Sequence, residues 1–300
     1  MTNSVNKKRR VLVLGGTGML GHKLVQRLEG PHEVWCTVRT GFDEVERFGI
    51  YTAGRTIENV SVERETDLRR AIEASRPDVV VNAVGIIKQL PSSKDVITTL
   101  TVNSILPHRL AQLGEEYGFH LVCISTDCVF SGERGNYSET DPADALDLYG
   151  RSKNIGEVTA GNCLTIRTSI IGRELATAHS LVEWFLSNRG AKVKGYANAI
   201  YSGFPTVVFA DILSELLQRE SYLTGLFHVS SDPIDKYELL RMIDREFGAG
   251  VEIERFEDFR IDRSLDSTRF RQATGFAPLP WDEMVRLMAA DAAPYASWRQ

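Results

Sequence analysis

The sequence has no excess of positive charge and no long hydrophobic run. Its 35 Lys and Arg residues are outnumbered by 40 Asp and Glu, for a formal net charge of −5, so no cationic field exists to hold a phosphate backbone. No apolar run approaches the roughly 18–20 residues of a membrane span. The run Val11-Leu12-Val13-Leu14 ends in Gly15-Gly16, too short for the core of a signal peptide. We therefore expect a cytoplasmic protein that binds neither nucleic acid nor membrane.

Cysteine and histidine are too sparse and scattered to indicate a disulfide framework or a metal site. The four cysteines, Cys36, Cys123, Cys128 and Cys163, have no Cys-x-x-Cys spacing, and most lie in apolar segments, where cysteine acts as a small hydrophobe. The six histidines do not fall at ligand spacing with Cys, Asp or Glu. We expect no metal, and the cysteine usage is typical of a reducing compartment.

Short apolar segments alternate with amphipathic ones along the first half of the chain. Between the apolar segments, hydrophobic residues recur at helical spacing, as in Leu20, Leu24, Val25 and Leu28. Strands that are apolar throughout and flanked by helices indicate an α/β fold, a doubly wound parallel sheet with right-handed crossovers. We predict strands over residues 11–14, 33–38, 78–81, 120–125 and 163–167.

Beyond Gly172 the alternation becomes less regular. We predict a helix over 181–186, a loop rich in Gly and Tyr over 195–205, a helix from Thr206 and a strand over 226–230. Residues 1–170, completed by 206–230, are expected to form a cofactor-binding domain. Residues 171–205 and 231–300 are expected to form a smaller mixed α/β lobe that binds the substrate, with the ligand site in the groove between the two.

A glycine-rich loop follows the first predicted strand and opens a helix. It satisfies both Gly-x-Gly-x-x-Gly and Gly-x-x-Gly-x-x-Gly. Glycines permit the tight turn and let backbone N–H groups approach a pyrophosphate at the positive end of the helix. A glycine turn without a ligand is the alternative, but the position after the first strand favours a dinucleotide. The predicted binding residues are Gly15, Thr17, Gly18, Met19, Leu20 and Gly21, in a run that also contains Gly16.

The end of the second predicted strand indicates which dinucleotide binds. An Asp or Glu there would bond the ribose hydroxyls of NAD, whereas an Arg accommodates the 2′-phosphate of NADP. Arg39 occupies this place, and we infer NADP(H), with a plain surface charge as the alternative. The segment Asn82-Ala83-Val84, at the end of the strand predicted over 78–81, is the next place where we expect the backbone to pass close to the cofactor.

A tyrosine and a lysine, Tyr149 and Lys153, stand at i and i+4, which on a helix places both on one face. A nearby cation favours the phenolate, so Lys153 is expected to draw the pKa of Tyr149 toward neutrality. Thr126 directly follows the strand predicted over 120–125, at the edge that faces the cofactor crevice in such a sheet. An exposed helical turn and a turn-capping threonine are the alternatives, but the order of the motifs favours hydride transfer with a tyrosine acid.

These residues resemble an extended short-chain dehydrogenase/reductase and, within that group, its dTDP-4-dehydrorhamnose reductase-like branch. The resemblance spans nearly the whole chain and implies a Rossmann fold, a homodimer and an NAD(P)-dependent oxidoreductase. The implied substrate is a nucleotide-activated 6-deoxy sugar with a 4-keto group. The residues that carry the resemblance are Ser125-Thr126-Asp127 with Val129-Phe130, Tyr149 with Lys153, Arg167-Thr168-Ser169 with Gly172, Pro205-Thr206, and Arg263 through Asp266 with Ser267.

The resemblance implies a role for each matched residue. NADPH gives a hydride to C4, Tyr149 gives a proton to the carbonyl oxygen, Thr126 positions that oxygen and Lys153 holds the nicotinamide ribose. Asn103 resembles the asparagine that supports the lysine in related enzymes. Lys88 and Arg263 are our candidates for the substrate diphosphate and the pocket rim, with surface charges as the alternative.

Cys128 and Ile170 stand where the rhamnose enzymes usually carry Tyr and Trp. Cys128 and His179 instead resemble a cysteine and a histidine of GDP-fucose synthases. A thiol and an imidazole can remove and return an α-proton on opposite faces of a ketone, so the pair predicts epimerisation at C3 or C5. The alternative is that Cys128 is a pocket wall and His179 is bonded locally.

Two other functions fit the same motifs. One is a redox-neutral nucleotide-sugar epimerase or dehydratase that retains NAD(P), and the other is a non-catalytic NADP-binding regulatory subunit. The intact set of Thr126, Tyr149 and Lys153 argues against the regulatory subunit, because a pure binder has no chemical need for it.

Overall fold

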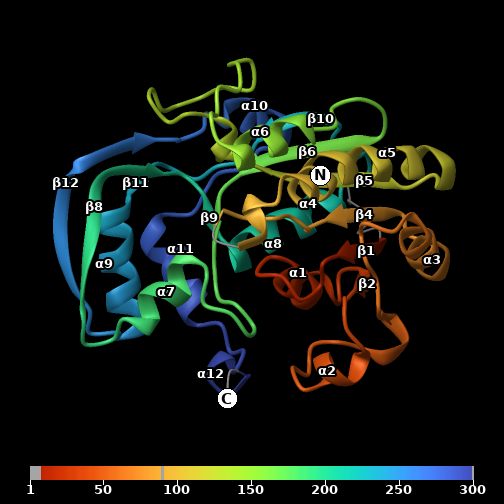
Figure 1. The fold of residues 1–300 in the computed structure, drawn as a ribbon, viewed down its shortest axis with the longest axis horizontal. Coiled ribbons are helices and arrows are strands. Elements are labelled where there is room, and N and C mark those ends of the chain that lie inside the picture. The colour runs from red at the N-terminus through yellow and green to blue at the C-terminus, as the bar shows by residue number, and fades with distance from the viewer. Residues whose placement is uncertain (1–7, 89–90, 299–300) are drawn as a thin grey trace, which may run out of the picture.

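The computed structural model describes residues 8–88 and 91–298, and its centre is a seven-stranded parallel sheet, here called the large sheet (Figure 1). The strand order is β10-β6-β5-β4-β1-β2-β3. The order reverses between β1 and β4, which opens a crevice at the carboxyl ends of these strands. The predicted doubly wound α/β fold is confirmed. The strands are β1 (Arg10–Leu14), β2 (Glu33–Thr37), β3 (Thr56–Ile57), β4 (Val79–Asn82), β5 (His120–Thr126), β6 (Cys163–Thr168) and β10 (Gly225–His228).

Helices cover both faces of the large sheet because its central strands, β1, β4 and β5, are apolar on both sides. Successive strand residues point to opposite faces, so Val11 and Val13 of β1 belong to one core cluster, and Leu12 and Leu14 belong to the other. Helices α1 and α8 bury their apolar residues in the first cluster, and α3 and α5 in the second. The bounds are α1 (Gly21–Leu28), α2 (Phe42–Glu46), α3 (Glu65–Ser75), α4 (Val96–Leu100), a π-helical turn η3 (Thr101–Ile105), α5 (Leu106–Tyr117), α6 (Leu148–Ile155) and α8 (Thr206–Leu217).

Every strand predicted for the large sheet is present, with ends that differ by at most two residues. The short β3 was not predicted, because two residues carry no readable periodicity. The strand β10 pairs with β6 at the edge of the large sheet, although residues 169–224, which separate the two strands in the sequence, contribute no strand to this sheet.

A three-stranded sheet, here called the small sheet, lies at one end of the molecule, with α9 packed against it (Figure 1). Its strands are β11 (Ile234–Asp235), β8 (Lys192–Tyr201) and β12 (Glu252–Asp262). β11 is antiparallel to β8 and β12 is parallel to it. The prediction of a loop over 195–205 is therefore wrong. Burial alternates along β8, and the glycine at 195 is needed because a Cβ there would lie 2.6 Å from the ring of Tyr237.

The remaining elements join the two sheets. A two-stranded pair, β7 (Ile170–Ile171) and β9 (Phe204–Pro205), leads the chain out of the large sheet and back toward it. Within the described residues, no helix is long and apolar enough to cross a membrane, and no cluster of His, Cys, Asp and Glu could hold a metal ion. The other elements are α7 (Leu181–Ser187), α9 (Lys236–Phe247), α10 (Thr268–Thr274), α11 (Trp281–Ala289), α12 (Tyr295–Trp298) and the 3₁₀ turns η1 (Ala53–Arg55), η2 (Pro91–Lys94) and η4 (Asp127–Val129).

Candidate active site

The glycine loop runs from the end of β1 into α1 and is shaped by backbone contacts that no side chain would permit. Gly15 has a φ of +79°, and a Cβ on Gly21 would lie 2.0 Å from the carbonyl oxygen of Gly15. The N–H of Gly16 donates to the carbonyl of Thr37, at the end of β2. Thr17 and Gly18 are exposed at the turn.

This loop fits the diphosphate of a dinucleotide. Among the described residues, none accepts a hydrogen bond from the N–H of Thr17, Met19 or Leu20. Such N–H groups at the start of a helix form an anion site, since the helix dipole adds positive potential there. A Cβ on Gly15, Gly16 or Gly21 would meet Val84, Cys36 or the Gly15 carbonyl, so the glycines allow the tight turn that the motif requires.

Three predicted cofactor contacts surround the loop. A Cβ on Gly15 would lie 2.8 Å from Val84, so the segment after β4 borders the loop directly. Asn82 is buried, and its side chain accepts from the N–H of Val84, with Ala83 between them. Arg39 is exposed two residues after the end of β2, on the other side of the loop. The structure thus brings the predicted residues to one edge of the sheet.

Asn103 lies in the π-helical turn η3 and joins two segments of the site. Its side-chain amide donates to the carbonyl of Ile86 and to the hydroxyl of Ser152, and its Oδ1 accepts from the N–H of Ile86. The loop after β4 is thereby tied to α6, which carries Tyr149 and Lys153. Asn103 is almost fully buried, so these partners replace the water it would otherwise bind.

Lys153 is buried against β5, and its ammonium donates to the carbonyl of Ile124 at 2.8 Å. Burial lowers the pKa of this lysine, because a charged amine loses its hydration there. α6 approaches its neighbours closely through two glycines. A Cβ on Gly150 would lie 2.2 Å from the carbonyl oxygen of Cys128, and one on Gly156 would lie 2.0 Å from that of Asn103.

Thr126 ends β5, and Tyr149 lies in the first turn of α6, which packs against β5 and η4. The hydroxyl of Thr126 donates to Asp127 and accepts from the N–H of Cys128 at 3.1 Å. Tyr149 is partly exposed as a residue, but the surroundings of its hydroxyl are enclosed. Burial raises the pKa of Tyr149, the nearby Cys128 raises it further, and the bond with Thr126 lowers it. The expected lowering of this pKa by Lys153 is not found, because desolvation dominates.

Asp147 is a residue of the site that was not predicted. Its Oδ1 accepts from the N–H of Gly150 and so caps the start of α6. Its Oδ2 pairs with Lys88 at 2.8 Å, and the ammonium of Lys88 lies 5.6 Å from the centre of the Tyr149 ring. An acidic residue directly before a helix is a readable N-cap signal that would have identified it.

The other predicted substrate residues fall into two places. The guanidinium of Arg263 donates to the carbonyls of Phe130 and Ser131, next to the end of η4, and its charge acts on Asp127 and Cys128. Burial raises the pKa of the Cys128 thiol to about 11, and the charge of Asp127 adds to this. His179 is exposed before α7, where its N–H donates to Glu174. No hydrogen bond between described residues joins the side chains of Cys128 and His179.

A buried ion pair supports this edge of the sheet from below. Arg167 of β6 and Glu157, after α6, form two bonds of 2.7 and 2.8 Å, and the hydroxyl of Ser125 donates to the same carboxylate. Arg167 also lies 5.1 Å from the centre of the Phe130 ring. The ion pair thus links β5, β6 and the segment after α6, next to Thr126.

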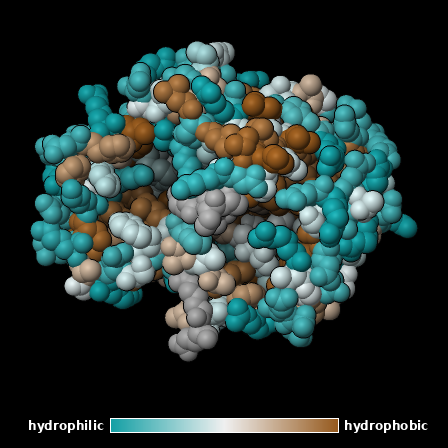
Figure 2. Space-filling model, viewed as in Figure 1, coloured by the Kyte–Doolittle hydropathy of each residue, from teal (hydrophilic) through white to brown (hydrophobic). Residues whose placement is uncertain are grey.

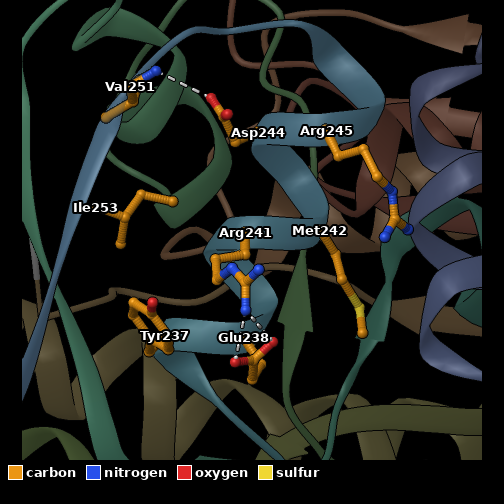
Figure 3. A pocket seen from close by; sticks show the side chains of 8 residues that line it. All are labelled: Tyr237, Glu238, Arg241, Met242, Asp244, Arg245, Val251 and Ile253. Atoms are coloured by element: carbon orange, nitrogen blue, oxygen red, sulfur yellow. Dashed lines mark hydrogen bonds and ion pairs between the residues drawn. The ribbon is translucent and has the colours of Figure 1, made fainter.

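A cavity of about 400 Å³ lies away from this site, between α9 and β12 (Figure 3). Two arginines and two acids line it, and Arg241 pairs there with Glu238. None of the predicted site residues reaches this cavity. Its lining residues are Tyr237, Glu238, Arg241, Met242, Asp244, Arg245, Val251 and Ile253.

Comparisons with known proteins agree with this arrangement. A family model described as the RmlD substrate binding domain matches residues 9–293. The chain is 24% identical to a dTDP-4-dehydrorhamnose reductase of Aggregatibacter actinomycetemcomitans, over 94% of this chain and 99% of the relative. It is 26% identical to methionine adenosyltransferase 2 subunit beta of Danio rerio, over 88% of each chain.

A solved structure has the same fold. The dTDP-4-dehydrorhamnose reductase of Bacillus anthracis str. Ames, determined in complex with NADP, superposes with a TM-score of 0.75. The match covers 95% of this chain and 100% of the other, at 20% identity.

Proposed function

The chain belongs to the RmlD substrate binding domain family, and from that premise we propose that it uses NADPH to reduce the 4-keto group of a nucleotide-activated 6-deoxy sugar. The observation that carries the proposal is that Thr126, at the carboxyl end of β5, and the start of α6 with Tyr149 lie at the edge of the large sheet that also holds the glycine loop. The reductase relative and the fold neighbour with NADP support it.

The cofactor would be held by the glycine loop, Arg39, the Asn82–Val84 segment and Lys153, and when bound it supplies the hydride. An arginine at Arg39 suits the extra phosphate of NADP, because a fixed cation there offsets its charge. Through its hydrogen bonds to Ile86 and Ser152, Asn103 holds the loop after β4 and α6 in fixed positions beside this space. We assign residues 1–170 with 206–230 to this cofactor-binding part.

Tyr149 is the proton donor in the proposed reaction. A raised pKa keeps its hydroxyl protonated at neutral pH, which is the form that reduction requires. As hydride arrives at the carbonyl carbon, the oxygen gains negative charge, and Tyr149 transfers its proton to that oxygen. Thr126, at the end of β5, would position the same oxygen.

We propose that Lys88 and Arg263 bind the diphosphate of the substrate. Arg263 belongs to the proposed substrate-binding part, residues 171–205 and 231–300, and Lys88 lies in the adjoining segment after β4. Their charges lie near the Asp127–Cys128 turn, so they flank the proton donor. A diphosphate placed there would compete with Asp147 for Lys88, which is exposed.

Epimerisation at C3 or C5 is a separable part of the proposal. Cys128 is a thiol at neutral pH because burial raises its pKa, so it would return a proton while His179 removes one. Incubation with a turned-over substrate in deuterated water tests this step. Deuterium at C3 or C5 that disappears in Cys128→Ser would support it, and a product without deuterium there would exclude it.

We further propose a cytoplasmic homodimer. The cysteines of the described residues are free, as in a reducing compartment. Figure 2 shows hydrophobic side chains gathered over α4 and α6, and Ile97 of α4, Leu146 before α6 and Ile155 at the end of α6 are exposed. Light scattering on the purified protein measures the mass of the assembly, and a monomer at micromolar concentration would contradict this part.

The first experiment is NADPH consumption against a panel of freshly generated nucleotide 4-keto-6-deoxy sugars. Tyr149→Phe should abolish consumption and leave NADPH binding intact, because only the transferred proton is lost. Tyr117→Phe removes a hydroxyl that bonds Glu73 far from the site and should change nothing.

The relative that is a subunit of methionine adenosyltransferase favours one alternative, a regulatory NADP-binding subunit. That function predicts tight binding of NADPH with no consumption of it on any sugar in the panel. Consumption that persists in Tyr149→Phe would overturn the assigned proton donor instead.

A further inference from the structure

The short helix α12 lies at the bottom of the view in Figure 1, and its side chains pack against α1 and the segment after α2. Tyr295 and Trp298 are buried and lie three residues apart, on one face of the helix, with their rings 5.3 Å apart. Both lie beyond residue 293, where the family match ends. We call Asp291, Tyr295 and Trp298 the C-terminal brace.

One path leads from the brace to the carbonyl of Gly18. The hydroxyl of Tyr295 lies 2.9 Å from Nε2 of His22, and Nδ1 of His22 donates to the Gly18 carbonyl at 2.8 Å. Burial lowers the pKa of His22 to about 4, so its ring is neutral at pH 7. With its one hydrogen on Nδ1, the ring has an acceptor at Nε2, and the single Tyr295 hydrogen is shared between this nitrogen and the carboxylate of Asp291.

A second path leads from the brace to the carbonyl of Gly16. The ring of Trp298 meets that of Phe48 edge to face at 5.4 Å, and Phe48 packs against Tyr51. The hydroxyl of Tyr51 donates to the Gly16 carbonyl at 2.9 Å. Two residues of one short helix therefore support two carbonyls of the same glycine loop.

Charged groups anchor the brace to α1 and to the loop before α7. Lys23 is almost fully buried and pairs with Asp291, whose carboxylate lies 3.0 Å from the Tyr295 hydroxyl. The guanidinium of Arg173 lies 4.6 Å from the centre of the Tyr295 ring and pairs with Glu183 of α7. Moving a buried charge away from its partner costs free energy, so these two ion pairs fix the surroundings of Tyr295.

We propose that the C-terminal brace holds the glycine loop in its binding geometry, and that Tyr295 and Trp298 are positioning residues for the cofactor. The inference rests on the proposed function, since the loop is taken as the dinucleotide site. When hydrogen bonds from the protein hold the Gly16 and Gly18 carbonyls, the N–H groups of the loop keep pointing toward the ligand. The loop then loses less conformational entropy when the cofactor binds. Without the brace the loop would have to be ordered by the cofactor itself.

The test compares Tyr295→Phe with Tyr117→Phe, each of which removes one bonded hydroxyl. NADPH affinity is measured by fluorescence titration, and the exchange of backbone amides at 15–21 by mass spectrometry without cofactor. Loss of one hydrogen bond should weaken NADPH binding and raise the exchange about fivefold in Tyr295→Phe alone. The kcat should stay within about twofold while the KM for NADPH rises, because the reacting groups are untouched.

Trp298→Phe and Trp298→Ala provide the second pair of variants. The phenylalanine keeps an aromatic contact with Phe48 and should bind NADPH nearly as the parent does, whereas the alanine should not. If exchange at 15–21 is unchanged in Tyr295→Phe and Trp298→Ala, the brace proposal is wrong, whatever the protein binds. If exchange rises in both variants but the parent protein binds no NADPH, the brace stands and the proposed function fails.

Discussion

The large sheet and the small sheet bury their strands to very different degrees. Every residue of β4 and β6 is buried, whereas no residue of β12 is. Strands enclosed on both faces must bond every backbone group to a neighbour, so their ends meet in fixed register at one edge. The glycine loop, Thr126 and Asn82 all lie at that edge. The small sheet presents charged side chains instead, where changes of residue cost little.

Ion pairs show the same contrast. The side chains of Arg167 and Glu157 are 5% and 6% exposed, and those of Lys192 and Glu252 in the small sheet are 53% and 72% exposed. An exposed pair gains little because water competes for both charges, but a buried pair that loses one partner leaves a charge without compensation. The residues of the proposed chemistry therefore stand on the strands that are most completely buried, whereas the charged residues of the small sheet are exposed to water.

Glu157→Gln should have the largest effect. Arg167 would keep its charge beside a neutral amide, at a cost of about 3–5 kcal/mol in the free energy of unfolding. The matched change in the small sheet, Glu254→Gln, removes a partner of the exposed Lys192 and should leave the free energy of unfolding nearly unchanged, because water competes for both charges. Urea unfolding of both variants measures the difference, and equal losses would break the comparison.

Gly156→Ala should follow, at about 3 kcal/mol. The added methyl group would meet the Asn103 carbonyl oxygen at 2.0 Å, so the backbone of α6 or η3 must move. Gly195→Ala in β8 meets side-chain atoms of Tyr237 and Ile253 first, at 2.6 and 2.7 Å, which can turn aside, and should cost about 1 kcal/mol. Thermal unfolding gives both values, and a larger loss for Gly195→Ala would reverse the ranking.

Acid should lower the free energy of unfolding through two buried histidines, His22 of α1 and His228 of β10. Burial lowers the pKa of His22 and of His228 from 6.5 to about 4, so the unfolded chain takes up protons first as the pH falls. Stability is full above pH 6.5 and declines toward pH 4, by about 2 kcal/mol for each histidine at pH 5. His179, in the loop before α7 and outside the large sheet, is exposed.

Urea unfolding between pH 7 and pH 4 measures this decline, with His228→Gln as the variant. Because the glutamine takes up no proton in this range, its stability should fall less steeply with pH than that of the parent. A parent protein whose stability is constant from pH 6.5 to pH 4.5 would contradict the assigned pKa direction.

The smallest stability effects should come from two helix caps. Asp147 caps α6 and Asp235 caps α9 in the same way, so each change to Ala should cost about 1 kcal/mol. Only Asp147→Ala should also lower kcat, by about tenfold, because α6 carries Tyr149 and loses the pair with Lys88. Steady-state kinetics separate the two, and an equal kcat in both variants would argue that the cap does not position Tyr149.

The parts of the fold that sequence reasoning predicted are those with strong local patterns. The strands of the large sheet were found because runs such as Val79–Asn82 are apolar throughout, and the glycine loop because its spacing is specific. β8 was missed because its glycine and tyrosines resemble a loop, and β12 because its charged residues hide any alternation. In such strands the pairing partner, rather than the local propensity, decides the structure.

The sequence by itself determined where the glycine loop stands, that Tyr149 and Lys153 share a helical face, and that the first half folds as a doubly wound sheet. These features follow from steric and hydrogen-bonding rules that act over a few residues. Only the tertiary structure decided that burial raises the pKa of Tyr149, that Asp147 ties Lys88 to α6, and that His22 bonds Tyr295 across 273 positions. Such contacts depend on how the whole chain packs its apolar surface, because no local pattern records which distant residue will fill a given place.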